Sequence, residues 1–464
     1  MTTYLVQAVF KGILIIGLCA MAALLSCDDQ DDTPATQANI SLLFSTDTLL
    51  FDTLLTDRLS ITKRLRIYNP NTEAINISEI SLTVGSEYSL IINGADENHA
   101  EDVLLNGNDS LLILVKLIVD KQDKDNPYLI KDIITTYWNG NTHQTLLMAW
   151  GQDAIYMGNE ILCDMTFTAD RPYVFYDSVL IDAGCLLTLE AGATLLFDAN
   201  APLLVAGQLI AVGDSTHPIT FRNSRWDIDY RIAPGQWPGL HFLIGSQNNL
   251  LDYTIIENAI TGITIGNPDE DTLADLTLKH SIIRHSSQAG LVAYSSDVVG
   301  ENLLIMNSGS SNVINAAGGF YHYTHCTFVN TPNSFYTSDP ATIFTNSLIL
   351  SDESKISSHL YLTLHNSIVW GPSDNDLWSS DDGQAGWSSS IHHNLIHSNT
   401  ALNDNYIFFD SLISLFQDTE NYNYELDSGS VAIDLGQNSP VWDDLLGRAR
   451  DEHPDLGAYE KQNL

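Results

Sequence analysis

One short phrase recurs seven times between Tyr253 and Ser398, and it constrains the fold more than any other feature of the sequence. Its copies are residues 254–258, 281–285, 303–307, 326–330, 347–351, 366–370 and 393–397. The third position of every copy is large and apolar: Ile256, Ile283, Ile305, Phe328, Ile349, Ile368 and Leu395. These positions are 27, 22, 23, 21, 19 and 27 residues apart. A repeat in the low twenties is typical of a solenoid, whose coils stack to bury a shared core.

The alternation inside the phrase predicts a strand. Successive side chains of a strand point to opposite faces, so the first, third and fifth positions share one face. We expect the apolar third position to form a stripe of the core, and the second and fourth positions to face outward. The fifth position is rich in asparagine (Asn258, Asn307 and Asn330). Asparagine tolerates the left-handed backbone of a turn, and its amide can hydrogen-bond to the next coil.

A second series of apolar positions precedes the first five copies. It consists of the pairs Gly239-Leu240, Gly262-Ile263, Gly290-Leu291, Asn312-Val313 and Ser334-Phe335, at steps of 23, 28, 22 and 22 residues. Two strand series with one variable period predict coils of at least two strands, joined by loops of variable length. A leucine-rich repeat would have a steadier period, and a propeller blade would need about 40 residues. We therefore expect an all-β parallel β-helix.

Residues 40–155 have a different pattern. Short alternating segments are separated by turn clusters such as Asn69-Pro70-Asn71 and Asn139-Gly140-Asn141, which is the pattern of an all-β sandwich. The segment 62–71, followed by 75–77 and 109–111, resembles the Ig-like modules that often stand next to bacterial membrane anchors. The resemblance implies a spacer without a binding site of its own.

The N-terminus reads as a targeting segment. Lys11 is followed by an uncharged run of 14 residues, short for a spanning helix and suited to a signal peptide. The run ends in Leu24-Leu25-Ser26-Cys27, which resembles the bacterial lipobox. The resemblance implies cleavage after residue 26 and acylation of Cys27, and two or more acyl chains anchor a protein stably to a membrane. The alternative is an ordinary signal peptide with an incidental cysteine.

Acidic residues follow Cys27 directly, at positions 28, 29, 31 and 32. Residues 27–39 read as a solvated tether. They also resemble the surface-export signals of some Gram-negative lipoproteins, although in other Gram-negatives an Asp after the cysteine resembles an inner-membrane retention signal. We expect a lipoprotein of the outer membrane, exposed on the cell surface. The predicted organisation is signal peptide 1–26, tether 27–39, sandwich 40–155 and solenoid 156–464.

The end of the chain carries the most specific motif. Residues 428–436, 447–450 and 454–460 closely resemble SPAIDxG…R…PDIGAYE, the tail of a family of secreted right-handed parallel β-helix proteins of Gram-negative bacteria. Val431 stands in place of the proline and Leu456 in place of the isoleucine. Residues 187–197 and 203–213 likewise resemble the early coils of such proteins. Counting these early coils with the seven phrases gives about ten coils, and we expect the tail to cap the second end of the rod. The resemblance implies no single activity.

The net charge limits the possible partners, and the cysteines indicate structural roles. The formal charge is 19 − 58 = −39, which would repel a phosphate backbone and excludes nucleic acid as a partner. Cys163 and Cys185 lie 22 residues apart, one coil length, and could pair as a disulfide in an oxidising envelope. Cys326 falls in the small-residue column and reads as a buried spacer. No cysteine pair has the spacing of a zinc site.

Catalytic motifs are missing from the sequence. A polygalacturonase-like enzyme would carry clustered Asp followed by G-H-G and R-I-K, and Asp381-Asp382 stands in a Ser-rich loop without G-H-G. The histidines near the start of several phrases read as polar turn positions. No Ser-His-Asp arrangement, phosphate-binding loop or metal motif appears. We therefore assign no catalytic or metal-ligating residues.

Two insertions interrupt the coils, and binding residues concentrate in such loops. Residues 223–237 lengthen the step from Phe221 to Ile256 to 35 residues, and residues 373–390 form the second insertion. The candidate ligand-binding residues are Arg222, Arg225, Trp226, Asp227, Asp229, Tyr230, Arg231, Trp237, Trp378 and Trp387. Arginine, carboxylates and aromatic rings could hold a sugar by stacking and hydrogen bonds. The alternative is that both insertions simply pack on the coils or cover an end.

These features predict a surface lipoprotein with a non-catalytic binding or scaffold role, a glycan being the expected ligand. The alternative is a polysaccharide lyase or glycoside hydrolase with a divergent active site. The partners would be the membrane, through the N-terminal lipid, and a polysaccharide. No cofactor is required, although Ca²⁺ could serve either function on so acidic a surface.

Overall fold

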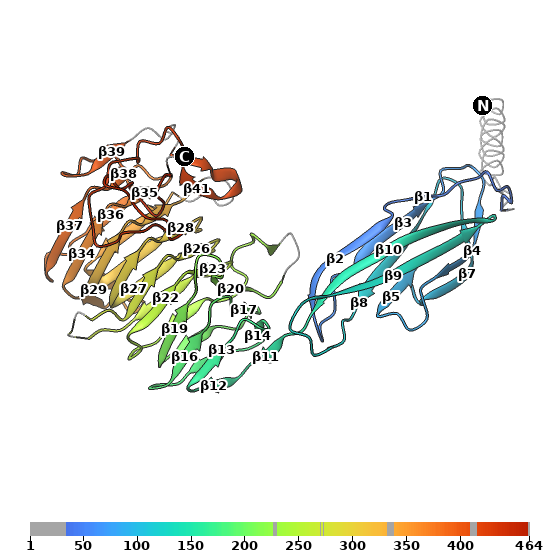
Figure 1. The fold of residues 1–464 in the computed structure, drawn as a ribbon, viewed down its shortest axis with the longest axis horizontal. Helices are drawn as coiled ribbons and strands as arrows, with labels where there is room; N and C mark the ends of the chain where they lie inside the picture. Colours follow the sequence, from blue (N-terminus) through green and yellow to red (C-terminus); the bar gives the residue numbers. More distant parts are fainter. Residues whose placement is uncertain are drawn as a thin grey trace, which may run out of the picture. The chain divides into compact units, whose positions relative to one another are not determined.

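The computed structural model describes residues 34–225, 230–269, 271, 273–331, 338–408 and 415–462. Residues 1–26, the predicted signal peptide, and Cys27 therefore lie outside the described residues. The chain divides into two compact units: residues up to 121 with Tyr128–Gly151, and Gln122–Pro127 with Gln152–Leu464. Both units are built of strands, so the expected all-β class is confirmed (Figure 1). Within the described part of the chain, no helix has the length and apolarity needed to cross a membrane.

The first unit consists of two five-stranded antiparallel sheets that face each other. The strands of one sheet, in spatial order, are β1 (Leu43–Phe44), β3 (Lys63–Tyr68), β8 (Ser110–Leu117), β5 (Tyr88–Ile92) and β6 (Ala95–Asp96). The other sheet holds β2 (Thr48–Leu55), β10 (Asn141–Gln152), β9 (Tyr128–Trp138), β4 (Ile75–Ser81) and β7 (His99–Leu105). Every second residue of β8 is buried, and one apolar cluster joins the inward residues of both sheets. This unit is a sandwich, as the alternating pattern predicts.

The second unit is a solenoid of parallel strands. Eleven short strands form one ladder in which each strand pairs with its equivalent in the next coil. They are β11 (Ile155–Met157), β14 (Tyr173–Phe175), β17 (Thr194–Phe197), β20 (Ile219–Asn223), β23 (Thr254–Glu257), β26 (Ile282–Arg284), β28 (Leu304–Met306), β30 (Thr327–Val329), β35 (Ile368–Trp370), β38 (Leu395–His397) and β39 (Tyr406–Phe408). We call this the phrase ladder, because six copies of the repeated phrase lie on it.

A sheet of sixteen strands forms the other walls as two further ladders. The first contains β12 (Glu160–Leu162), β15 (Val179–Ile181), β18 (Leu203–Val205), β21 (Leu240–Phe242), β24 (Ile263–Gly266), β31 (Thr342–Thr345) and β36 (Leu377–Ser380). The second contains β13 (Met165–Phe167), β16 (Leu186–Leu189), β19 (Gln208–Val212), β22 (Asn249–Asp252), β25 (Leu276–Lys279), β34 (Leu360–His365) and β37 (Trp387–His392). Two long strands, β27 (Leu291–Glu301) and β29 (Val313–Thr324), belong to both ladders. Each coil therefore contributes a strand, or half of a long strand, to each of three ladders.

The inward column of the phrase ladder follows the predicted third position only as far as Phe328. Phe328 pairs with Val369, and Val369 pairs with Ile396. The predicted residues Ile368 and Leu395 face the other side, so the alignment of the last two phrases is wrong by one residue. A shift of one residue exchanges the faces of a strand. The pattern could not fix the register here, because both faces of these strands are buried and apolar.

The fifth copy of the phrase is not on the ladder. β30 pairs directly with β35, and β32 (Ser347–Ile349) instead forms an antiparallel hairpin with β33 (Lys355–Ser357). Ile349, expected in the core, is 72% exposed. The hairpin is an insertion between β31 and β34 of the same coil. In the preceding series, Ser334-Phe335 lies outside the described residues, and Val313 pairs with Thr342 as the next rung.

The polar fifth position of the first three phrases has left-handed backbone. The φ angles are 66° at Asn258, 57° at His285 and 55° at Asn307. The amide of Asn330 also reaches the neighbouring coil, since its Oδ1 accepts a hydrogen bond from the backbone N–H of Ser308 at 2.9 Å. Asparagine at this position therefore shapes the corner and ties adjacent coils together, as its chemistry predicts.

The C-terminal tail lies against the outer face of the phrase ladder. It includes β40 (Phe416–Asp418), the 3-10 helix η2 (Thr419–Asn421) and β41 (Asn423–Leu426). Outward residues of the ladder, Leu304, Met306, Val329, Ile368 and Leu395, form one apolar cluster with tail residues Leu415, Phe416, Tyr424, Leu426, Leu456 and Tyr459. The tail thus covers a flank of the solenoid, where we expected it to cover an end. The physical reason is that these outward positions are apolar and need burial.

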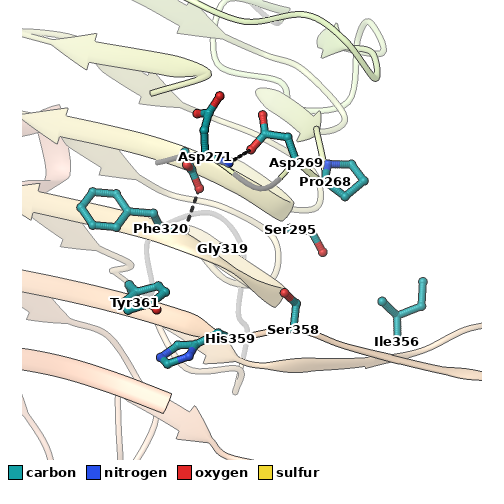
Figure 2. Close-up of a pocket in the computed structure, with 11 residues that line it drawn as sticks. Pro268, Asp269, Asp271, Ser295, Gly319, Phe320, Ile356, Ser358, His359 and Tyr361 are labelled. Carbon is teal, nitrogen blue, oxygen red and sulfur yellow. Dashed lines mark hydrogen bonds between the residues drawn. The ribbon is translucent and has the colours of Figure 1, made fainter. Parts of the chain in front are cut away.

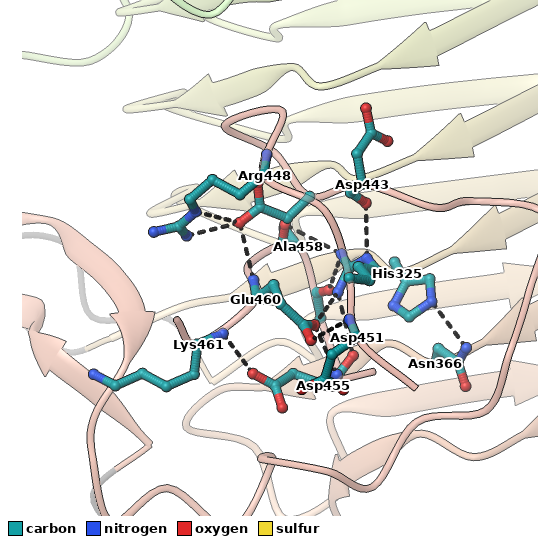
Figure 3. Close-up of polar contacts among 12 residues, drawn as sticks. His325, Asn366, Asp443, Arg448, Asp451, Asp455, Ala458, Glu460 and Lys461 are labelled. Atoms are coloured by element: carbon teal, nitrogen blue, oxygen red, sulfur yellow. Dashed lines mark hydrogen bonds and ion pairs between the residues drawn. The ribbon is translucent and has the colours of Figure 1, made fainter. Parts of the chain in front are cut away.

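The motif of the tail forms a largely buried polar network (Figure 3). The side chain of Arg450 is 2% exposed, and its Nη1 lies 3.2 Å from Glu460 Oε2. Its Nη2 donates to Asn302 Oδ1 at 2.8 Å, and the backbone N–H of Ala458 donates to Thr327 Oγ1 at 2.9 Å. The motif residues therefore fasten the tail to the coils, which is a structural role.

Candidate functional site

The first predicted binding loop is only partly described. The structure places Arg222, Arg225, Tyr230, Arg231 and Trp237, whereas Trp226, Asp227 and Asp229 lie outside the described residues.

Trp237 belongs to the core. Its ring is fully buried and stacks on Phe197 with centroids 4.1 Å apart, and its Nε1 donates to the carbonyl of Glu257 at 2.9 Å. The loop rejoins the coil at this residue, which bridges to Ala259. A buried indole cannot contact a sugar, so the prediction that Trp237 binds a ligand is wrong.

The basic residues next to this loop take part in the fold. Arg222 Nη1 lies 3.3 Å from Glu257 Oε1, and Arg284 Nη2 lies 2.7 Å from Oε2 of the same buried carboxylate. The guanidinium carbon of Arg225 lies 3.3 Å from the centroid of the Tyr230 ring. Arg222 is therefore held by a neighbouring coil, and Arg225 pairs with a ring of its own loop.

Asn258 holds the returning part of the loop. Its Nδ2 donates to the carbonyls of Arg231 at 3.2 Å and Ala233 at 2.9 Å. An asparagine of the repeated phrase thus anchors the insertion, in addition to turning its own strand.

The two tryptophans of the second insertion lie on different ladders. Trp378 is on β36 and is 44% exposed. Trp387 is on β37, packs partly against the core and donates from Nε1 to Ser389 Oγ at 3.2 Å. They therefore do not lie along one strand as a single stacking surface.

The cysteines of the solenoid have structural positions. Cys163 and Cys185 are joined in a disulfide with Cα atoms 4.7 Å apart, the pairing that their separation of one coil suggested. Cys326 is fully buried as a free thiol, and burial raises its pKa to about 12. So buried a thiol is a spacer of the core.

A pocket that the sequence analysis did not single out lies at the corner between the first and second ladders of the large sheet (Figure 2). Its volume is about 320 Å³. It is lined by Pro268, Asp269, Asp271, Ser295, Asp297, Gly319, Phe320, Ile356, Ser358, His359 and Tyr361. We call it the corner pocket.

The corner pocket forms where some coils pass the corner as continuous strands and others carry inserted loops. A loop between β24 and β25 supplies Asp269 and Asp271, and the inserted hairpin supplies Ile356. Between them, β27 and β29 cross the corner as continuous strands, with a register irregularity between Tyr294 and Ser296. The pocket therefore lies over two uninterrupted strands and is flanked by two insertions.

One side of the pocket is aromatic. The rings of His359 and Tyr361 are stacked with centroids 3.9 Å apart and planes at 3°. Phe320 pairs with Tyr361 across the strands, with ring centroids 6.3 Å apart. Tyr361 is 43% exposed, so its ring remains accessible to a ligand. Figure 2 shows these three rings along neighbouring strands.

The other side is acidic. One carboxylate oxygen each from Asp269, Asp271 and Asp297 lie within 4.8 Å of one another. Asp297 is 6% exposed, and its Oδ1 accepts from the backbone N–H of Phe320 at 2.9 Å. Burial, together with the neighbouring carboxylates, raises the pKa of Asp297 to about 7. A carboxyl group with so perturbed a pKa in a pocket is typical of a functional site.

Asp275 supports this acidic side from below the surface. It is 1% exposed, and its Oδ2 accepts from the backbone N–H of Asp297 at 2.9 Å. Its Oδ1 accepts from Asn267 Nδ2 at 2.6 Å, and burial raises its pKa. Asn267 Nδ2 also donates to Asp269 Oδ2 at 3.0 Å, so one amide joins the buried and exposed carboxylates.

Part of this pocket had a signal in the sequence. The step from Gly262 to Gly290 is 28 residues, the longest of its series, and the extra length holds Asp269 and Asp271. Nothing in the sequence indicated Asp297, because it lies within a segment that has the pattern of an ordinary solenoid strand.

Comparisons with known proteins give little guidance. No family model and no curated protein matches the sequence. A family 123 glycoside hydrolase from Clostridium perfringens has a TM-score of 0.18 and 5% identity, covering 25% of this chain and 30% of the hydrolase. A human PapD-like domain has a TM-score of 0.17 and 12% identity, covering 28% of this chain and 94% of that domain.

A third solved structure, a protein of unknown function from Porphyromonas gingivalis, has a TM-score of 0.18 and 14% identity, with coverage of 26% and 59%. The chain thus spans about a third of the hydrolase and less than two thirds of this protein. TM-scores this low carry no argument about fold or function.

Proposed function

We propose that this protein is a lipoprotein of the Gram-negative outer membrane, anchored through acylated Cys27 and exposed on the cell surface. The lipobox-like sequence and the acidic tether support this proposal. In it, the sandwich is an Ig-like spacer and the solenoid is a right-handed parallel β-helix, a proposal that the three parallel ladders and the tail motif support. Replacing the lipidated cysteine tests the anchor: Cys27→Ser should move the protein from membranes to the soluble fraction, and continued membrane association would refute it.

We further propose that the solenoid binds a polysaccharide without cleaving it, and that the corner pocket is the site. The observation that carries this proposal is the exposed ring of Tyr361, stacked on the half-buried His359 beside Phe320 and facing a group of carboxylates in one cavity. Sugar rings present apolar faces that pack on aromatic rings, and their hydroxyl groups can donate to carboxylates. The corner pocket thus combines aromatic rings with polar groups that could orient a sugar.

A glycan array with the full chain in detergent, run together with an assay for cleavage products, tests this function. Tyr361→Ala should weaken binding of the glycan by roughly tenfold, since loss of an aromatic stacking contact costs about 1.4 kcal/mol. Tyr137→Ala is the matched control, because Tyr137 is similarly exposed, at 39%, on a strand of the sandwich. Equal binding by both variants would place the site elsewhere on the protein.

The second candidate function is that of a polysaccharide lyase or glycoside hydrolase. The carboxylates of Asp269, Asp271 and Asp297 favour it, because their oxygens lie within 4.8 Å and retaining glycosidases place two carboxyl groups about 5–5.5 Å apart. Release of reducing ends would establish a hydrolase and release of unsaturated ends a lyase. Binding without either product would exclude this candidate for the glycan tested.

A further inference from the structure

Several buried carboxylates of the solenoid have a basic partner from the protein. Glu257 lies between Arg222 and Arg284, and Glu460 pairs with Arg450. Asp376, which is fully buried, has its Oδ2 2.7 Å from His397 Nδ1. This is the expected arrangement, because an unpaired charge inside a protein is strongly destabilising.

Two buried carboxylates at the corner pocket, Asp275 and Asp297, differ from these. None of the ion pairs found among the described residues includes Asp269, Asp271, Asp275 or Asp297. Asp297 is only 6% exposed. Its Oδ2 is inaccessible to solvent and has no hydrogen-bond partner among the described residues. Four acidic side chains thus gather at one corner, and the missing positive charge must come from outside the chain or the buried group must be protonated.

We propose that Asp269, Asp271 and Asp297 bind a divalent cation, and that this cation is Ca²⁺. Carboxylate oxygens from all three residues lie within 4.8 Å of one another, close enough to share one ion. Only oxygen ligands are offered, which suits a hard cation, and Ca²⁺ accepts six to eight oxygen ligands in irregular geometry. The remaining positions face the pocket, where water or ligand hydroxyl groups can complete the coordination.

The surrounding hydrogen bonds arrange the three carboxylates for this role. Asp269 Oδ1 accepts from the backbone N–H of Asp271 at 3.2 Å, and Asp271 Oδ1 accepts from that of Leu273 at 2.8 Å. Asp297 Oδ1 is occupied by the backbone N–H of Phe320, which leaves Oδ2 as its ligand atom. Two ligands come from the loop after β24 and one from β27 in the next coil, so the cation joins consecutive coils.

The cation site does not depend on the polysaccharide proposal, because it is tested without any glycan. The full chain in detergent is stripped with a chelator and titrated with CaCl₂ in a calorimeter at about 0.15 M salt, which suppresses general attraction to the acidic surface. We expect one Ca²⁺ per chain. Asp297→Asn should weaken this binding by roughly tenfold or more, because it removes one charged ligand.

Two further variants make the result decisive. Asp269→Asn replaces an exposed ligand, so it should weaken Ca²⁺ binding without any threat to the core. Glu190→Gln, at an exposed carboxylate elsewhere on the solenoid, should leave binding unchanged. Thermal unfolding gives a second measurement: Ca²⁺ should raise the Tm of the wild type and of Glu190→Gln, but not that of Asp297→Asn.

The proposal is overturned if the wild type binds no Ca²⁺ stoichiometrically, or if Asp297→Asn and Asp269→Asn bind it as the wild type does. Binding of Mg²⁺ in preference to Ca²⁺ would also overturn the assignment of the ion. Loss of glycan binding in Tyr361→Ala, with Ca²⁺ binding intact, would separate the two proposals for this pocket.

Discussion

Breaking the buried ion pair of the tail should destabilise the solenoid strongly. Arg450 contacts Glu460, the side chain of Asn302 and backbone carbonyls including that of Gly457, and both charged side chains are 2% exposed. Arg450→Met would leave the Glu460 carboxylate buried without its cation. Removal of one partner of a buried pair costs about 3–5 kcal/mol, so we expect a loss of that size in the free energy of unfolding.

The assay is urea unfolding of the full chain, with the solenoid transition compared between variants. A double-mutant cycle gives the control. Arg450→Met combined with Glu460→Gln should cost less than the sum of the single changes, since no buried charge then remains unpaired. A loss below about 1 kcal/mol for Arg450→Met, or simple additivity in the cycle, would show that the pair does not fasten the tail.

Two other predictions concern the phrase ladder. Phe328→Ala should lower the free energy of unfolding by about 3–5 kcal/mol, because Phe328 is fully buried. Ile349→Ala, at a 72% exposed position, should change it by no more than about 0.5 kcal/mol. Equal losses for the two variants in urea unfolding would refute the assignment of 347–351 to a surface hairpin. Burial lowers the pKa of His285 to about 3, below the unfolded value near 6.5, so its contribution to stability is present above pH 6.5 and is lost as pH falls toward 3, by up to ~1.4 kcal/mol per pH unit. His285→Asn, which keeps a residue suited to the left-handed backbone, should flatten this slope; an unchanged pH profile would contradict the reasoning.

The repeated phrase predicted the solenoid because its inward side chains must be apolar in every coil. Ile256, Ile283, Ile305 and Phe328 lie where the pattern placed them. The predicted alignment is wrong for the last two phrases, because both faces of their strands are apolar. The strand of Ile368 is buried on both sides, so a neighbouring residue could take the inward position without any change in composition.

The corner pocket shows a different limit. Asp269 and Asp271 lie in an unusually long coil, so their loop could be located from spacing alone. Asp297 and Tyr361 lie on strands two coils apart, and only the pairing of β27, β29 and β34 brings them to one cavity. Conversely, Trp237 was predicted to bind a ligand because of its aromatic ring, but it packs inside the coil. An aromatic ring can pack in a core as well as on a sugar.

The position of the tail has a consequence for how the protein is made. Because a chain is synthesised from its N-terminus, the coils emerge before residues 415–459. Until then, Leu304, Met306 and Val329 on the phrase ladder have no cover, because their apolar partners belong to residues 415–459. A chain that lacks residues 415–459 would expose this apolar face to its neighbours and to quality-control proteases.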